Sequence, residues 1–216
     1  MMFRSFTSET RVLVLAPHTD DGEFGCGGTI ARFAEEGSQV TYVAFSAAEK
    51  SLGKEWPQTQ LRHEVMEATK ILGITPASVR LLDYPVREFP QHRQAILDEM
   101  VALNRELEPD LVLLPSTIDC HQDHQVVSQE GFRAFKHTSL LGYELPWNNP
   151  TFDTNFFVAL DKAHLDKKVR ALECYKSQKH RPYASAEFVR ALARTRGVQM
   201  GSQHAEVFES IRWVWR

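Results

Sequence analysis

Two short clusters of histidine and aspartate stand out because their side chains could bind a metal ion or move protons. The first, PHTDD, covers residues 17–21 and follows the apolar run 11–16. The second, TIDCHQDH, covers residues 117–124 and follows the apolar run 110–116. Together they supply His18, Asp20, Asp21, Asp119, His121, Asp123 and His124. Imidazole and carboxylate groups are common zinc ligands and are also the usual acids and bases of hydrolytic enzymes.

Strands and helices alternate along the first two thirds of the chain, and this pattern predicts how the clusters come together. Apolar, strand-like runs occupy residues 11–16, 39–46, 78–85 and 110–116. Helical spacing of apolar residues predicts helices at 27–37, 59–73, 91–108 and 124–136. The alternation favours an α/β fold, a Rossmann-like parallel sheet with helices on both faces.

Residues 137–216 show a weaker pattern. We expect strands at 142–147, 155–160 and 206–215, and a helix within 159–178. No linker rich in proline, glycine or serine separates this part, so residues 1–216 are expected to form one domain. Residues 11–136 would be its Rossmann-like core with the metal site, and 137–216 a smaller α+β extension that shapes the substrate pocket.

The two clusters should meet at one edge of this sheet. Strand order 3-2-1-4 places the first and fourth strands side by side, and ligands bind beyond the carboxyl ends where the order reverses. A dinucleotide loop needs G-x-G-x-x-G, but Ile30 stands where the third glycine belongs after Gly25 and Gly27. Plain capping turns are a second interpretation. Because the clusters follow two adjacent strands, the third interpretation, a metal site, is favoured.

A metal site suits the residue types. His18 and Asp21, three residues apart in a turn, can converge on one ion, and a histidine of HQDH supplies the third ligand. Catalytic zinc takes three protein ligands, and the same set suits ferrous iron. Asp20 is then placed as general base for a water whose pKa the metal lowers to about 7. The other histidine can stabilise an oxyanion, and Asp123 can hold an imidazole in one tautomer.

The segment PHTDDGEFGCGGTIA (17–31), taken with HQDH (121–124), resembles the zinc-dependent N-deacetylases of the LmbE/PIG-L family. Their pattern is PHPDD-x-E-x-GCGGT, followed by H-x-D-H after the fourth strand. An R-x-E at 62–64 and a Leu-Gly at 72–73 also fit. Thr19 replaces the usual proline, and Gly22 stands where many members have an acidic residue. The resemblance covers residues 11 to about 136 and implies a Rossmann-like hydrolase.

The resemblance also implies a role for each motif residue. The implied zinc ligands are His18, Asp21 and His124. Asp20 would be the base, His121 would stabilise the oxyanion, and Asp123 would orient an imidazole. Arg62 would lie near the acyl or hydroxyl groups of the substrate. The implied reaction removes an N-acetyl group from an amino sugar or sugar conjugate, a sugar nucleotide included.

Substrate contacts are also expected from the C-terminal part. Trp147 lies in LGYELPWNNPTF, where an aromatic ring and amides suit a sugar, although core packing is an alternative at least as strong. Arg194, Arg196 and His204 lie in a glycine-containing stretch. This stretch would form either a cationic lid over a phosphate-bearing substrate or a solvated loop.

Composition excludes several classes of protein. The chain has 216 residues and a net charge of −3, with no block of lysine or arginine, so nucleic acid is not an expected partner. Three scattered cysteines and the lack of a leader or membrane segment favour a cytoplasmic protein. Zn²⁺ is the expected cofactor, with Fe²⁺ or another divalent ion as alternatives. The expected partner is a small N-acetylated sugar substrate, and the option of a homo-oligomer stays open.

Two other functions compete with N-deacetylation. A metallohydrolase on the same scaffold could act on an ester or on the amide of a thiol conjugate, because these reactions need the same attacking water and oxyanion stabiliser. A non-catalytic binding protein is the third hypothesis. Asp20 argues against it, because a binding module has no use for a base beside its metal.

Overall fold

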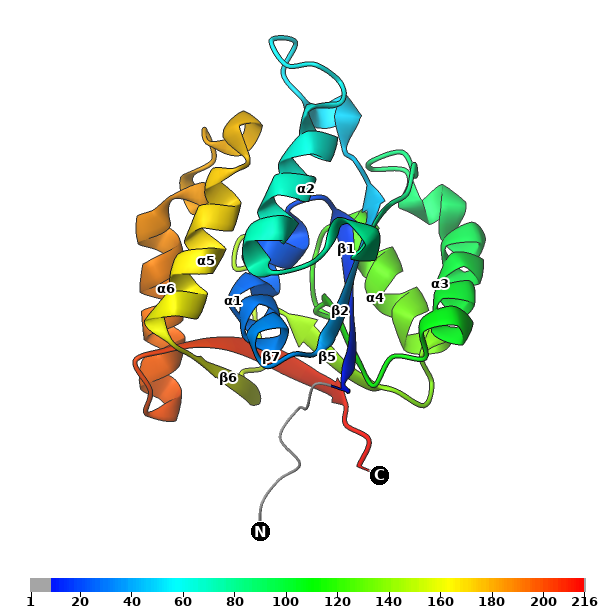
Figure 1. Cartoon of the computed structure of the whole chain (residues 1–216). Coiled ribbons are helices and arrows are strands. Elements are labelled where there is room, and N and C mark those ends of the chain that lie inside the picture. Colours follow the sequence, from blue (N-terminus) through cyan, green and yellow to red (C-terminus); the bar gives the residue numbers. More distant parts are fainter. Residues whose placement is uncertain (1–8, 216) are drawn as a thin grey trace.

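A seven-stranded sheet runs through the middle of the molecule in the computed structural model, which describes residues 9–215 (Figure 1). Its spatial order is β3 (Val79–Leu81), β2 (Gln39–Ser46), β1 (Arg11–His18), β4 (Leu111–Pro115), β5 (Ser139–Tyr143), β7 (His204–Arg212), β6 (Phe156–Leu160). The first five strands are parallel, and β7 is antiparallel to both of its neighbours. The expected Rossmann-like order is therefore confirmed, including the adjacency of β1 and β4.

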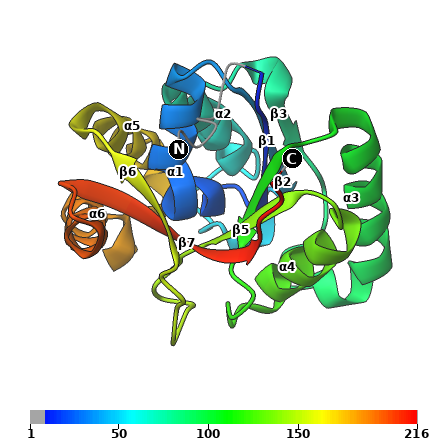
Figure 2. The same cartoon turned by 90° about the horizontal axis from the view of Figure 1, so that it is seen from below.

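Helices cover both faces of the sheet, as the sequence predicts (Figures 1 and 2). One face carries α1 (Asp21–Glu35), α2 (Gln60–Leu72) and α5 (Lys162–Glu173), with α6 (Ala186–Met200) beside α5. The other carries α3 (Arg93–Leu107) and α4 (Gln122–Ala134). Strand β1 contributes side chains to two hydrophobic cores. Val12 and Val14 pack on the first face of the sheet, and Leu13 and Leu15 pack on the second. This double burial explains its unbroken apolar run.

The turn after β1 is tighter than expected. Strand β1 continues to His18, and α1 begins at Asp21, six residues before the predicted start at Gly27. The helix is kinked at Cys26, where φ is −145°. Sequence reasoning placed the start after the kink because the glycines suggest a turn. The kink is stabilised by the side chains of Lys168 and Glu206, which are far from α1 in the sequence.

A buried ion pair from the extension caps both halves of the kinked helix. Lys168 Nζ donates to the Phe24 carbonyl at 2.7 Å and to Glu206 Oε1 at 2.6 Å. The Glu206 carboxylate accepts from the backbone N–H groups of Gly28 and Thr29 at 2.9 and 2.7 Å. An anion at the start of the second helical segment satisfies its free N–H groups.

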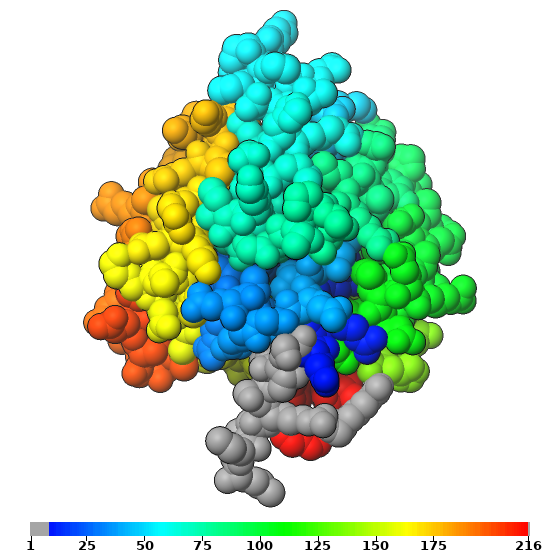
Figure 3. All heavy atoms as spheres, viewed as in Figure 1, coloured from blue at the N-terminus to red at the C-terminus, as the bar shows by residue number. Residues whose placement is uncertain are grey.

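The glycines of GCGG serve close packing. A side chain at Gly25 would overlap the Tyr143 ring, and one at Gly28 would overlap Leu160. Both partners belong to strands of residues 137–216, which extend the same sheet. Figure 3 shows side chains of α5 (yellow) lying directly against those of α1 (blue) and α2 (cyan to teal) on this side of the molecule.

Several predicted bounds need correction. Strand β3 covers three residues rather than 78–85. Beyond Leu81 the chain still donates backbone hydrogen bonds to β2, from Leu82 to Ala44 and from Tyr84 to Phe45, but without regular strand pairing. The strand expected at 142–147 is β5 and ends at Tyr143. The stretch expected as a lid or loop begins inside α6, which ends at Met200. Within residues 9–215, no helix is long and apolar enough to span a bilayer.

Candidate metal centre

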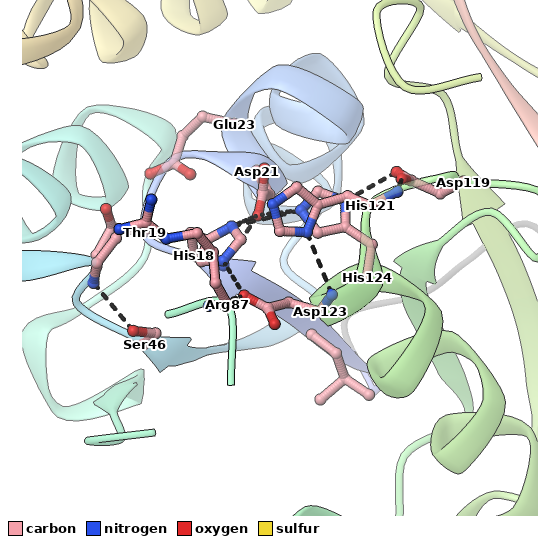
Figure 4. A network of polar contacts seen from close by, with 12 residues as sticks. His18, Thr19, Asp21, Glu23, Ser46, Arg87, Asp119, His121, Asp123 and His124 are labelled. Carbon is pink, nitrogen blue, oxygen red and sulfur yellow. Dashed lines mark hydrogen bonds and ion pairs between the residues drawn. The ribbon is translucent and has the colours of Figure 1, made fainter. Parts of the chain in front are cut away.

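The adjacent ends of β1 and β4 bring the two sequence clusters together (Figure 4). His18 is the last residue of β1, Asp20 occupies the N-cap position of α1 without a side-chain capping bond, and Asp21 is the first residue of α1. His121 caps α4, and His124 lies in its first turn. Because both strands are parallel, both helices begin at the same edge of the sheet.

Three side-chain atoms form a nearly equilateral triangle at this edge. His18 Nδ1 lies 3.0 Å from Asp21 Oδ2, which lies 3.2 Å from His124 Nε2. The two histidine nitrogens are 3.3 Å apart. Ligands at about 2.0–2.1 Å around tetrahedral zinc lie about 3.3 Å from one another. The spacing of the three atoms therefore fits a small divalent cation.

Two further carboxylates hold the imidazoles of this triangle. His18 Nε2 is 3.0 Å from Asp123 Oδ2, and His124 Nδ1 is 2.8 Å from Asp119 Oδ2. Both aspartates are buried. A carboxylate on the far nitrogen makes that nitrogen the N–H donor and leaves the other nitrogen free to ligate. Sequence reasoning anticipated such a role for Asp123 but gave none to Asp119.

His121 lies beside the triangle and is oriented differently. Its Nδ1 accepts the backbone N–H of Asp123 at 3.2 Å, so the proton of a neutral ring belongs on Nε2. Within the described residues, His18, His121 and His124 also form a group with ligand atoms within 4.8 Å of one another. Asp21 fits the third ligand position better, since the Nδ1 lone pair of His121 is already engaged.

The electrostatics of the edge favour a bound cation. Burial opposes charge on His124, but the Asp21 charge and the Asp119 hydrogen bond raise its pKa to about 10. Burial also opposes charge on Asp21, yet the charges of His124 and His18 hold its pKa well below its usual range. The pKa of His121 is lowered by burial and by these two neighbouring histidines. The carboxylate charge that stabilises a protonated His124 would equally stabilise a metal cation, and binding of the metal would displace the proton.

Asp20 is adjacent to the triangle but is not one of its members. Burial, followed by the adjacent Asp21 charge, raises the pKa of Asp20 to about 6. It lines a cavity of about 290 Å³, into which His18, Asp21, His121 and His124 also open. The candidate ligands are therefore reachable from outside, and a carboxylate that could accept a proton lies next to them.

A buried glutamate supports the turn that carries these residues. Glu23 accepts hydrogen bonds from the hydroxyls of Tyr42 and Tyr175, the second at 2.8 Å. Burial raises the pKa of Glu23 to about 8 despite these bonds. Both hydroxyls also lie within 2.9 Å of the Thr19 carbonyl. Glu23 and the tyrosines thereby fix the backbone between His18 and Asp20.

The four predicted substrate residues are placed differently from one another. Trp147 lines the cavity, with its ring stacked on Tyr183 at 3.8 Å. Arg62 is held by Glu49 and Asp83, and Arg196 by Glu144. Arg196 lines a second, smaller hollow, and His204 begins β7. Of the four, Trp147 is the one that lines the cavity at the triangle.

Other lining residues were missed by sequence reasoning. Arg87 enters from the segment after β3, and its φ of +70° is unusual for a residue with a side chain. Gln178, Arg181 and Tyr183 enter from the segment between α5 and α6. No periodic pattern marks these segments, although YKSQKHRPYAS carries an aromatic and cationic composition that could have drawn attention.

Fold and site together define a class of protein, an α/β enzyme with candidate metal ligands and a free carboxylate at the switch point of its sheet. The chain belongs to the PIG-L family, whose model is described as GlcNAc-PI de-N-acetylase and matches residues 13–135. The prediction of an N-deacetylase, a hydrolase acting on amides, is thereby confirmed.

Individual proteins show the extent of the similarity. A diacetylchitobiose deacetylase of Thermococcus kodakarensis is 26% identical over 234 residues, covering 97% of this chain and 85% of its own. A 4-oxalmesaconate hydratase of Pseudomonas putida is 25% identical over 226 residues, covering 89% and 82%. The crystal structure of the conserved protein TT1542 from Thermus thermophilus is 30% identical, with a TM-score of 0.78 and coverage of 95% and 96%.

Proposed function

We propose that the chain is a zinc-dependent enzyme that hydrolyses the acetamide of an N-acetylated amino sugar or sugar conjugate, nucleotide-linked sugars among the candidates. The observation that carries this proposal is the triangle of His18 Nδ1, Asp21 Oδ2 and His124 Nε2, which opens onto the cavity. The relative that acts on diacetylchitobiose supports the substrate class.

The donor set favours zinc. Two neutral imidazoles and one carboxylate are a usual catalytic zinc set, and ferrous iron is the alternative. Asp119 and Asp123 keep the imidazoles in the ligating tautomer. When bound, the metal supplies Lewis acidity, which polarises a carbonyl and lowers the pKa of water.

Asp20 and His121 are assigned the proton chemistry. Asp20 lies next to the ligand triangle, so it can accept the proton of the attacking water and later deliver it to the leaving amine. His121 carries its proton on Nε2, because Nδ1 accepts the Asp123 N–H. From that position it donates a hydrogen bond to the carbonyl oxygen as negative charge develops there.

Aromatic rings on the cavity wall suit a sugar ring. Trp147 stacks on Tyr183 with an interplanar angle of 11°, and Phe24 meets both rings edge-on. All three line the cavity. We assign the sugar-facing wall to this trio and treat residues 1–216 as one domain, in which 137–216 shape the pocket.

The test is acetate release from a panel of N-acetylated amino sugars, free, lipid-like and nucleotide-linked, with O-acetyl sugars and thiol-conjugate amides as comparison. Zinc-loaded protein is expected to release one acetate per free amine formed, and chelator-treated protein none. Release only from esters or thiol conjugates would favour the alternative hydrolase. Zinc binding without release from any N-acetyl sugar would contradict the proposal and direct attention to hydration reactions, as in the hydratase relative.

A further inference from the structure

One side of the cavity contains buried polar atoms that have no partner within the described part of the chain. Nε of Arg181 and Oε1 of Gln178 are both buried and make no hydrogen bond. Gln178 is 4% exposed, and both residues line the cavity that contains the ligand triangle. Unpaired buried donors and acceptors are costly, so their placement in a cavity indicates a ligand that satisfies them.

Arg181 is held in a fixed orientation. Its Nη1 donates to the Tyr183 hydroxyl, and its guanidinium lies 5.7 Å from the centre of the Tyr183 ring. Tyr183 is itself stacked on Trp147. With Nη1 engaged, the edge formed by Nε and Nη2 has no hydrogen-bond partner within the described residues. This edge of a guanidinium binds carboxylate or phosphate through two parallel hydrogen bonds.

A second arginine lines the same cavity from the other part of the fold. Both backbone polar groups of Arg87 are tied to the start of α4, since its N–H donates to Asp123 and its carbonyl accepts from Gln122. These bonds hold its left-handed backbone conformation, with φ at +70°. Within residues 9–215 no ion pair or hydrogen bond is found for the Arg87 guanidinium, whereas Arg62 and Arg196 are paired with carboxylates.

We propose that the substrate carries an anionic group, a carboxylate or a phosphate, beside its N-acetylated sugar, and that Arg181 is the specificity-determining residue that binds it. Gln178 Oε1 accepts from a neighbouring hydroxyl of the same substrate, and Arg87 adds a second positive charge at the cavity. This inference rests on the proposed deacetylase function and narrows its substrate class.

A competing role for Arg181 is to act through Asp20. Both residues line the cavity, and the Asp20 charge is close enough to interact with the guanidinium. Such a positioning role would affect every substrate equally and would change kcat. A role in binding an anion instead changes KM, and only for substrates that carry the anion.

The experiment compares three N-acetylglucosamine derivatives that differ in the group at C1: a neutral methyl glycoside, a 1-phosphate and a glycolate glycoside. The wild type is expected to favour at least one anionic derivative over the neutral one by tenfold or more in kcat/KM. Arg181→Gln should reduce this preference by about ten- to a hundredfold, mainly through KM, as for a lost charge-assisted pair. Arg181→Lys keeps the charge without the two-donor edge and should recover part of the preference.

A matched control removes the same charge elsewhere. Arg105 lies on the exposed side of α3, so Arg105→Gln should leave the preference for anionic derivatives unchanged. The phosphate and glycolate arms identify which anion the site selects. Equal use of neutral and anionic derivatives by the wild type would overturn the inference. A loss in Arg181→Gln that is equal for all three, and lies in kcat, would overturn it in favour of the Asp20 role.

Binding of the deacetylated amines, measured by titration calorimetry, gives an answer that does not depend on turnover. The inference is supported if glucosamine 1-phosphate or the deacetylated glycolate glycoside binds more tightly than methyl glucosaminide, and if Arg181→Gln abolishes this difference. Equal binding of the three contradicts it. Absence of acetate release with a preserved anion preference in binding would contradict the deacetylase proposal alone.

Discussion

The core at residues 11–136 and the extension at 137–216 contribute to the same cavity in different ways. The core supplies the candidate ligands and Asp20 from the end of β1 and from the segments that follow β1 and β4, so the adjacency of these two strands brings them together. The extension supplies Trp147, Gln178, Arg181 and Tyr183 from irregular segments. In the function that we propose, the chemistry therefore lies on rigid strand ends, whereas the selectivity lies on segments that tertiary packing positions.

The sharpest test of this division removes the base and leaves the triangle. Asp20→Asn is expected to lower kcat by roughly 10²–10⁴-fold with bound zinc unchanged, because a general base contributes about that much. Steady-state kinetics and metal analysis check both parts. The control Asp98→Asn, on the exposed side of α3, should match the wild type. Retained turnover in Asp20→Asn would remove this aspartate from the chemistry.

The second test weakens the contact between the extension and α1. Lys168→Met leaves the buried Glu206 carboxylate without its cation, so the free energy of unfolding should fall by about 3–5 kcal/mol. Urea denaturation measures the change. The adjacent Lys167→Met breaks only a half-exposed pair with Glu35 and should cost less than about 1 kcal/mol. Equal losses in the two variants would show that the ion pair does not join the extension to α1.

A third variant tests the support of the triangle. Asp119→Asn cannot accept the His124 N–H as a carboxylate does, so zinc affinity should drop by roughly 10–100-fold. Competition with a chelating dye measures the affinity. Asp110→Asn, at the opposite end of β4, provides the control. Unchanged affinity in Asp119→Asn would mean that His124 is oriented by packing alone.

The smallest expected effect concerns the predicted substrate residues. Trp147→Leu removes one ring of the cavity wall, so KM should rise by about three- to tenfold, the range for one aromatic stacking contact. Arg196→Gln should change KM by less than about twofold, because its guanidinium is paired with Glu144 away from the triangle. Equal changes in KM for the two variants would indicate that the segment containing Arg194, Arg196 and His204 contacts the substrate after all.

The sequence predicted much of the core because its signals are local. The apolar run before His18 and the cluster after residue 116 each identify a strand end, and the α/β alternation then makes them neighbours. Asp119 received no role because its bond to His124 depends on how the loop before α4 turns. The start of α1 was misplaced because Lys168 and Glu206, which hold its kink, are more than a hundred residues away.

The sequence by itself determined the fold class, the meeting of the two clusters and the kinds of groups that meet. Periodicity and parallel strand order are enough for this, because they fix which ends of which strands share an edge. Only the tertiary structure decided which atoms point at one another and which residues of the extension reach the cavity. His18 presents Nδ1 to Asp21, and Arg181 enters the cavity while Arg196 turns to Glu144. These side-chain orientations depend on packing between segments that are distant in the sequence, and no local sequence pattern encodes that packing.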